Sequence, residues 1–192
     1  MGQINPDKTF AIIIGTSVYQ CEELHNLESV YDNMYGVNDV LIRVLGIPTT
    51  NRIWLTDAKR SEILSTLKDP GGRAAEFETL IIYFSGHGII DEDRSNYYLG
   101  LKETDLDDLG DTSISISKLS ERLGNRNWNI ILVIDACFSE KSFETFNQRN
   151  FFIMASSSRS ATSKYPLNEE NSAFTSKFIE IIKNGIENGP ED

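Results

Sequence analysis

Two short apolar runs constrain the fold of this chain more than any other feature of its sequence. Residues 80–88 read LIIYFSGHG, and residues 129–140 read NIILVIDACFSE. Each run begins rich in β-branched and aromatic residues, which is typical of a strand buried on both faces of a parallel sheet. The first run ends at His87 between two glycines, and the second ends at Cys137. Ligands of open α/β sheets bind beyond the carboxyl ends of the strands, so neighbouring strands would bring this histidine and cysteine together.

The rest of the chain alternates between strand-like and helix-like segments. Apolar runs predict further strands at 10–15, 52–56 and 151–155, with a short edge strand or hairpin arm at 97–101. Helical spacing of apolar residues predicts helices at 29–45, 58–67, 116–123 and 173–184. This alternation predicts an α/β fold with a central, largely parallel sheet flanked by helices. We expect residues 1–192 to form a single domain and leave open that it belongs to a longer protein.

Charge and hydropathy exclude several classes of protein. The net charge of −11 argues against nucleic-acid binding, which needs a basic face. It is compatible with a preference for basic peptides, although solubility is the simpler explanation. No apolar run is long enough to span a bilayer, and the first ten residues resemble neither a signal peptide nor a myristoylation site. These features predict a cytoplasmic protein without a membrane partner.

His87 and Cys137 are candidates for a base beside a nucleophile. A structural loop histidine and a small buried cysteine are the alternatives, but both residues come directly after buried strands. Asp135 shares a strand face with Cys137 by the alternation of strand side chains. An acid there would raise the pKa of the thiol on contact, so it is better placed to bind a cation of the substrate. Cys21 lies in a polar loop and is treated as incidental; the two cysteines and two histidines match no zinc spacing.

The motifs resemble those of caspase-like cysteine peptidases, the group that contains caspases, metacaspases and their bacterial relatives. YFSGHG and VIDACFS look like the histidine and cysteine boxes of that family, and FAIIIGTSVY resembles its first strand. ASSS at 155–158 and NSAFT at 171–175 resemble its fifth strand and the start of the next helix. The pattern is most similar to bacterial metacaspase-like domains, although Phe138 and Glu140 replace the residues usual after the metacaspase cysteine.

The resemblance implies a caspase-like sandwich and a cysteine endopeptidase. Cys137 would attack the peptide carbonyl, His87 would transfer the protons, and the backbone N–H groups of Gly88 and Cys137 would form the oxyanion hole. The chemistry needs no metal or organic cofactor. Calcium activates many metacaspases, but the acids between residues 91 and 111 lack an EF-hand spacing and are better explained as a solvated loop.

The same resemblance predicts cleavage after Arg or Lys. Ser85 and Asp135 stand two residues before the histidine and the cysteine, as in the metacaspase pocket. Asp32 resembles a further pocket acid if a one-residue gap is allowed. Such carboxylates would bind a guanidinium and repel an acidic side chain. The alternative is cleavage after acidic residues, for which Arg159 and Lys164 would supply the cations.

Two further predictions concern partners and processing. The substrate is a protein or peptide, and a regulatory protein or further domains of the same chain are possible partners. The segment 139–150 contains Lys141 and Arg149, and self-cleavage is expected there if basic residues are accepted. A catalytically idle caspase-like module that only binds a partner is the alternative to an enzyme, but the presence of both dyad residues favours the enzyme.

Overall fold

The computed structural model describes residues 4–91, 96–123, 127–137, 151–156 and 171–185. Its centre is a five-stranded parallel sheet with the order β2-β1-β3-β7-β8. The strands are β1 (Thr9–Gly15), β2 (Arg52–Thr56), β3 (Thr79–Ser85), β7 (Asn129–Asp135) and β8 (Phe151–Ala155). The two runs that end in His87 and Cys137 are therefore adjacent central strands, β3 and β7, as the sequence predicted.

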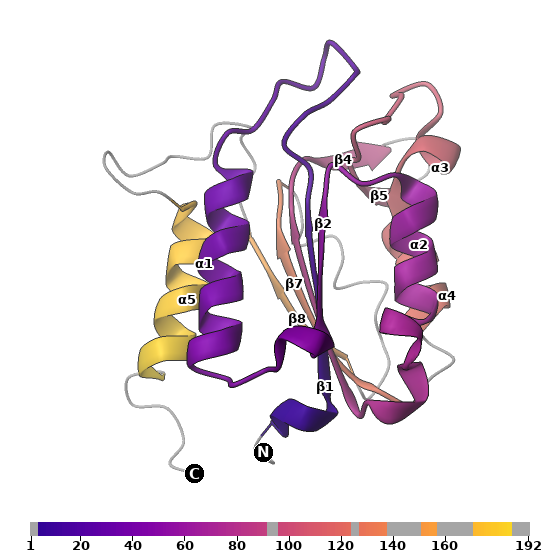
Figure 1. Ribbon diagram of the computed structural model, residues 1–192. Helices are drawn as coiled ribbons and strands as arrows, with labels where there is room; N and C mark the ends of the chain where they lie inside the picture. Colours follow the sequence, from indigo (N-terminus) through magenta and orange to yellow (C-terminus); the bar gives the residue numbers. More distant parts are fainter. Residues whose placement is uncertain (1–3, 92–95, 124–126, 138–150, 157–170, 186–192) are drawn as a thin grey trace.

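Two pairs of helices cover the sheet. Figure 1 shows one pair on each face: α1 (Val30–Arg43) with α5 (Ala173–Asn184), and α2 (Arg60–Lys68) with α4 (Ile116–Leu123). The left-handed Gly46, at φ 67°, lies just beyond α1, where such a glycine favours the end of a helix. Short 3₁₀ turns occupy Pro6–Lys8, Thr49–Asn51, Pro70–Gly72 and Ala74–Glu76. This three-layer arrangement confirms the predicted α/β fold.

A small antiparallel sheet lies beyond the carboxyl end of β3. It has the order β4-β5-β6, formed by β4 (Gly88–Asp91), β5 (Asn96–Leu99) and β6 (Ile114–Ser115), and the short helix α3 (Leu109–Thr112) precedes β6. The sequence placed an edge strand or hairpin arm at 97–101. The structure confirms the hairpin arm, because β5 pairs antiparallel with β4, which follows His87 directly. It is not an edge strand, since β6 pairs with its other side. His87 thus lies between the central sheet, which ends with β3, and the small sheet, which begins with β4.

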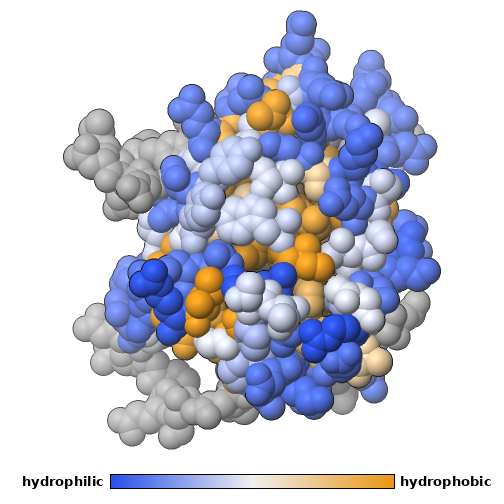
Figure 2. Space-filling model, in the orientation of Figure 1, coloured by the Kyte–Doolittle hydropathy of each residue, from blue (hydrophilic) through white to orange (hydrophobic). Residues whose placement is uncertain are grey.

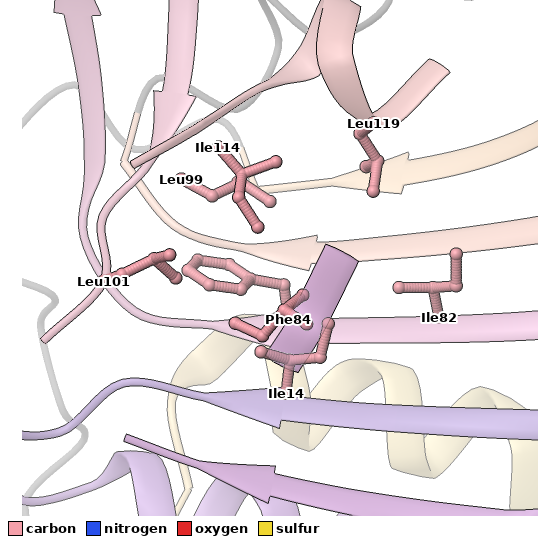
Figure 3. Close-up of a pocket in the computed structure, with 8 residues that line it drawn as sticks. Ile14, Ile82, Phe84, Leu99, Leu101, Ile114 and Leu119 are labelled. Atoms are coloured by element: carbon pink, nitrogen blue, oxygen red, sulfur yellow. The ribbon is translucent and has the colours of Figure 1, made fainter. Parts of the chain in front are cut away.

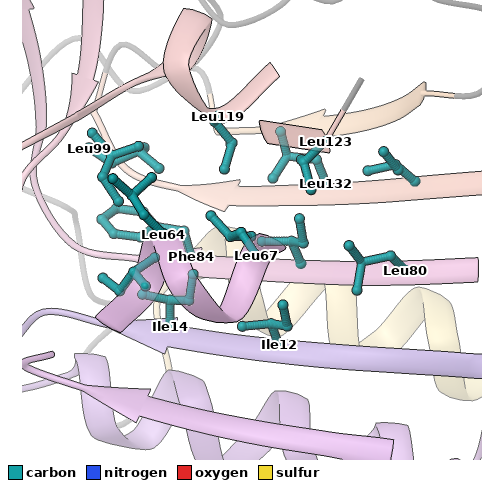
Figure 4. Close-up of a cluster of buried hydrophobic side chains, with 14 of the residues drawn as sticks. Ile12, Ile14, Leu64, Leu67, Leu80, Phe84, Leu99, Leu119, Leu123 and Leu132 are labelled. Carbon is teal, nitrogen blue, oxygen red and sulfur yellow. The ribbon is translucent and has the colours of Figure 1, made fainter. Parts of the chain in front are cut away.

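The two faces of the central sheet bury different kinds of side chain. Alternate residues of β1, β3 and β7 pack with α2 and α4 in a wholly apolar cluster (Figure 4). Its sheet members are Phe10, Ile12, Ile14, Leu80, Ile82, Phe84, Ile130, Leu132 and Ile134. The intervening residues contact α1 and α5 and include Ile13, Ile81, Tyr83 and Val133. On this second face, β3 and β7 end in the polar residues Ser85 and Asp135.

The apolar cluster encloses one small cavity with a volume of about 10 Å³. Aliphatic and aromatic side chains point into it from the central sheet, from α2 and α4, and from the small sheet (Figure 3). A water needs about this much space and two to four polar partners. The lining supplies no polar side chain, so the cavity is a packing defect of the core and not a ligand site.

The surface is predominantly hydrophilic. Seen from the β2 edge, blue residues dominate, and weakly polar or apolar residues reach the surface over the middle of this face (Figure 2). Tyr31 and Tyr35 of α1 are among the exposed large side chains, and Tyr35 contacts Trp54 of β2 at 5.0 Å between ring centroids. Within the described residues, no helix is both long and apolar enough to cross a membrane.

Candidate active site

The candidate site lies where β3 and β7 end. Ser85 and Asp135 are register partners, and the Gly86 amide donates to the Asp135 carbonyl at 3.3 Å. A Cβ on Gly88 would overlap with the carbonyl oxygen of Cys137, so only glycine permits this approach of the two backbones. The Tyr97 hydroxyl from β5 donates to the same carbonyl at 2.9 Å. The structure therefore brings together the backbones that follow the two strands, including both predicted oxyanion donors, Gly88 and Cys137.

His87 is buried and held by the loop that connects β1 to α1. Its backbone N–H donates to the Tyr19 hydroxyl at 2.8 Å, and the Tyr19 ring lies 4.7 Å from the imidazole between centroids. Imidazole Nε2 lies 2.8 Å from the carbonyl oxygen of His25. A carbonyl oxygen can only accept, so Nε2 carries the proton and Nδ1 is the basic nitrogen of the neutral ring. The His25 ring packs edge-on against the His87 ring at 4.8 Å.

Burial is the main cause that lowers the pKa of His87. A low-dielectric environment penalises the charged imidazolium, and the nearby His25 adds a smaller effect in the same direction. The bond to the His25 carbonyl acts in the opposite sense because it stabilises the protonated ring. The result is a histidine that stays neutral, and therefore basic, to lower pH than an ordinary one.

Asp135 lies in a second polar group beneath α1 and α5. Its Oδ2 accepts from the Thr175 hydroxyl at 2.7 Å and from the Asn33 amide at 3.3 Å, and the Ser172 hydroxyl also donates to it. Asn33 also donates to Ser85 Oγ at 3.1 Å and accepts from the Ser172 amide at 2.7 Å. Residues of α1 and of the start of α5 thus donate to one carboxylate oxygen at the end of β7.

Burial raises the pKa of Asp135, while the hydroxyls that donate to it lower it by a smaller amount. Tyr83 lies behind this group, fully buried, with its hydroxyl 2.6 Å from Thr175 Oγ1. Because Thr175 donates its single hydroxyl proton to Asp135, Tyr83 is the donor in the hydrogen bond between Tyr83 and Thr175. Burial, and next the Asp135 charge, raise the pKa of Tyr83 well above its ordinary value.

The structure places the predicted site residues unequally. His87, Gly88 and Cys137 lie at neighbouring strand ends, and Ser85 pairs with Asp135. Asp32 is exposed on α1 and is not part of this group. The neighbouring Asn33 is buried and donates to Ser85 and Asp135 instead, so an amide lies beside Asp135 where the sequence predicted a second carboxylate. Arg159, Lys164 and the segment 139–150, with Lys141 and Arg149, lie outside the described residues.

Several residues of the site were missed by sequence reasoning. His25 accepts the hydrogen bond from His87 through its backbone carbonyl, and any residue type could supply that group. The sequence therefore gives no signal for this contact. Tyr19 lies in the predicted loop, within the segment that resembled the first strand of the family, but its hydroxyl had no predicted role. Thr175 belongs to the NSAFT segment, whose match to the family signalled a constraint without giving its cause. Among the described residues, no group of His, Cys, Asp or Glu side chains could hold a metal ion.

A parallel sheet between two helical layers, with a histidine and a cysteine at adjacent strand ends, defines the class of cysteine peptidases with a caspase-like fold. Residues 8–190 match the family model of the caspase domain, peptidase family C14, and the chain belongs to that family. The crystal structure of caspase-1 from Spodoptera frugiperda is similar in fold, with a TM-score of 0.66 and 15% sequence identity. The match covers 95% of this chain and 71% of that one. A comparison with curated proteins gave no significant match.

Proposed function

We propose that this chain is a cysteine endopeptidase in which Cys137 is the nucleophile and His87 the acid–base residue. The hydrogen bond between His87 Nε2 and the His25 carbonyl is the observation that carries this proposal. It fixes the tautomer that leaves Nδ1 to accept the thiol proton. The Cys137 sulfur then adds to the peptide carbonyl, and the proton on Nδ1 passes to the leaving amine. Water attacks the resulting thioester with the same histidine as base, which returns the thiol.

The oxyanion of the tetrahedral intermediate would be bound by the N–H groups of Gly88 and Cys137. The close approach of the Gly88 backbone to Cys137 supports this assignment, since both donors belong to the same small region. Such preorganised donors lower the activation barrier by about 3–4 kcal/mol in well-studied hydrolases. No step of this reaction requires a metal or an organic cofactor. Activation by calcium stays a prediction, and the acids between residues 91 and 111 do not have the spacing of an EF-hand. The cytoplasmic location also stays a prediction.

We further propose that the residue before the cut is Arg or Lys. Asp135 supplies the charge for this pocket, Ser85 lines it, and Asn33 takes the place predicted for Asp32. One oxygen of Asp135 accepts three hydrogen bonds from the protein, which fixes the orientation of the carboxylate. Its other oxygen is the expected acceptor for the substrate cation. With one carboxylate instead of two, the pocket should favour a cationic side chain less strongly than two acids would.

The experiment is a pair of fluorogenic peptides that differ only in Arg or Asp before the cut. The wild type should cleave the Arg peptide faster, and Cys137→Ala should cleave neither. Cys21→Ala is the matched control, because it removes the other thiol of the chain and should leave cleavage unchanged. Cleavage by Cys137→Ala would refute the dyad; faster cleavage after Asp would refute only the proposed pocket.

A further inference from the structure

Asp57, directly after β2, has the only positive φ angle among the non-glycine residues in the described part of the chain. Its φ of 48° is left-handed, a conformation that aspartate tolerates better than most residues but that is still disfavoured. Such backbone conformations persist where the surrounding structure over-determines them, and they cluster at functional sites. The Asp57 amide donates to the Gly15 carbonyl at 2.9 Å, which ties this turn to the end of β1.

The Asp57 carboxylate binds the start of the loop that connects β1 to α1. Oδ1 accepts from the backbone N–H of Ser17 at 2.7 Å and from that of Val18 at 3.0 Å. Oδ2 accepts from the Ser17 hydroxyl at 3.0 Å and from the Tyr31 hydroxyl of α1 at 3.3 Å. Two adjacent amides that donate to one carboxylate oxygen fix the direction in which the chain leaves β1.

The same loop then folds back on itself. The Leu27 amide donates to the Ser17 carbonyl at 2.9 Å, and the Tyr19 amide donates to the side-chain oxygen of Asn26 at 3.0 Å. These bonds join the first arm of the loop to the second arm, which carries His25. Ser17 is therefore an anchor for both arms of the loop, and the Gln20 amide adds a second anchor by donating to the Lys102 carbonyl at 2.9 Å.

Each arm of the loop makes one hydrogen bond to His87. Tyr19, on the first arm, accepts from the His87 backbone amide and donates to the Thr16 carbonyl at 3.0 Å. His25, on the second arm, accepts from Nε2. These two hydrogen bonds, and the ring contacts of Tyr19 and His25 with the imidazole, tie the orientation of His87 to this loop.

We propose that Asp57 is a positioning residue for His87, acting through residues 16–27; this inference rests on the proposed role of His87 as acid–base residue. Asp57 does not touch the substrate or the reacting atoms. It holds the loop in the register that presents the His25 carbonyl to Nε2 and the Tyr19 hydroxyl to the His87 amide. A misplacement of about 1 Å at a reacting group costs on the order of 100-fold in rate.

The test uses the full chain and two substitutions. Asp57→Gly accepts the left-handed φ and removes the carboxylate, so backbone strain is not the cause of any loss. Asp57→Asn also tolerates this φ and keeps the Oδ1 acceptor, so it should rescue most of the function. The matched control is Asp69→Gly, which removes a carboxylate that accepts from the Ala74 amide at 3.0 Å, before β3 and at the opposite end of the strands.

Two readouts separate this inference from the proposed function. On the peptide that the wild type cleaves, Asp57→Gly should lower kcat roughly 10- to 100-fold with a smaller change in KM. In ¹⁵N NMR, the chain has only two histidines, and His25→Gln identifies the signals of His87. Asp57→Gly should remove the signature of a protonated, hydrogen-bonded Nε2, and Asp57→Asn and Asp69→Gly should retain it.

The NMR readout holds even if the wild type cleaves no peptide, an outcome that would refute the proposed function alone. An Asp57→Gly variant with unchanged His87 signals and a kcat within about twofold of wild type would overturn the positioning role. Should Asp57→Gly not fold, Asp57→Asn decides the question. It keeps the Oδ1 acceptor but loses the charge that accepts from the Ser17 and Tyr31 hydroxyls, so kcat should fall by roughly threefold while the Nε2 signature is retained. A kcat equal to that of the wild type would overturn the inference.

Discussion

The two faces of the central sheet are built from alternate residues of the same strands, yet they serve different purposes. The face covered by α2 and α4 is hydrocarbon along the length of β3 and β7. The face covered by α1 and α5 starts apolar and becomes polar towards the carboxyl ends, where Tyr83 and Ser85 are buried and Asp135 is partly buried. The first face contributes stability through apolar burial, whereas the second gives up some of that contribution to hold a carboxylate in place.

The largest expected effect on stability lies on the apolar face. Leu132 is fully buried between β7, α2 and α4. Leu132→Ala should lower the free energy of unfolding by about 2–5 kcal/mol, because it removes hydrocarbon and leaves a cavity. Urea denaturation measures this change. At temperatures where the variant stays folded, the preference for Arg over Asp peptides should match wild type; a changed preference would mean that the two faces do not divide stability and recognition.

The next effect concerns the contact between the strand ends. Gly88→Ala places a Cβ on the Cys137 carbonyl and should reduce kcat/KM on the order of 100-fold by moving the two backbones apart. Gly110→Ala is the matched control, because nothing lies within 4 Å of its added Cβ. Peptide cleavage by both variants compares the two glycines. Equal activity would show that the Gly88 approach is not needed for catalysis.

A smaller loss of stability is expected on the polar face. Thr175→Val keeps the shape of the side chain but removes one donor to Asp135 and the acceptor of the Tyr83 hydroxyl. Unsatisfied buried groups cost about 1–3 kcal/mol, so urea denaturation should show a loss in that range. In contrast to Leu132→Ala, this variant should also weaken the preference for Arg. Thr175→Ser is the control, since it keeps a hydroxyl that donates to Asp135 and accepts from Tyr83; an equal loss of preference there would contradict the assignment.

The smallest effect is the pH dependence of recognition. Asp135 must be ionised to bind a guanidinium, and burial raises its pKa in the folded state. The ratio of kcat/KM for Arg over Gln peptides should therefore fall at a higher pH than an ordinary aspartate would give. The effect of pH on stability runs in the opposite direction, because a raised pKa means that the protonated carboxyl favours the folded state. The contribution of Asp135 to stability is fully present below its unfolded pKa and is lost as the pH rises through its folded pKa. Asp135→Asn should show neither dependence, and a pH-dependent ratio in that variant would assign the effect to another group.

Sequence reasoning predicted the parts of the molecule that depend on local patterns. The apolar runs predicted the strands β3 and β7. Because these strands are parallel neighbours, His87 and Cys137, which follow them, lie at the same edge of the sheet. On α1 the sequence comparison favoured Asp32, whereas the structure turns its neighbour Asn33 towards Ser85 and Asp135. A single residue turns the side chain by about 100° around a helix, and the phase of α1 depends on the loop before it. Asn33 faces Asp135 and Asp32 faces solvent for that reason.

Other parts could not have been predicted from local patterns. The His25 carbonyl reaches His87 across 62 positions, and Asp57 reaches Ser17 across 40. Both contacts depend on how the β1–α1 loop packs, which no local pattern shows, and the His25 contact uses a backbone carbonyl that any residue could supply. The small sheet was also only partly predicted, because β4 has four residues and β6 has two, too few for an alternating pattern to be distinguished from a loop.

The central claim is that His87 activates Cys137, and the rate at which Cys137 reacts with iodoacetamide tests it without any knowledge of the substrate. A Cys21→Ser background leaves Cys137 as the only thiol, so mass spectrometry follows one reaction. The account predicts that alkylation near neutral pH is fast, slows at least about tenfold in the added His87→Ala variant and slows less in Asp57→Gly. Equal alkylation rates with and without His87, in variants shown to be folded, would contradict the dyad.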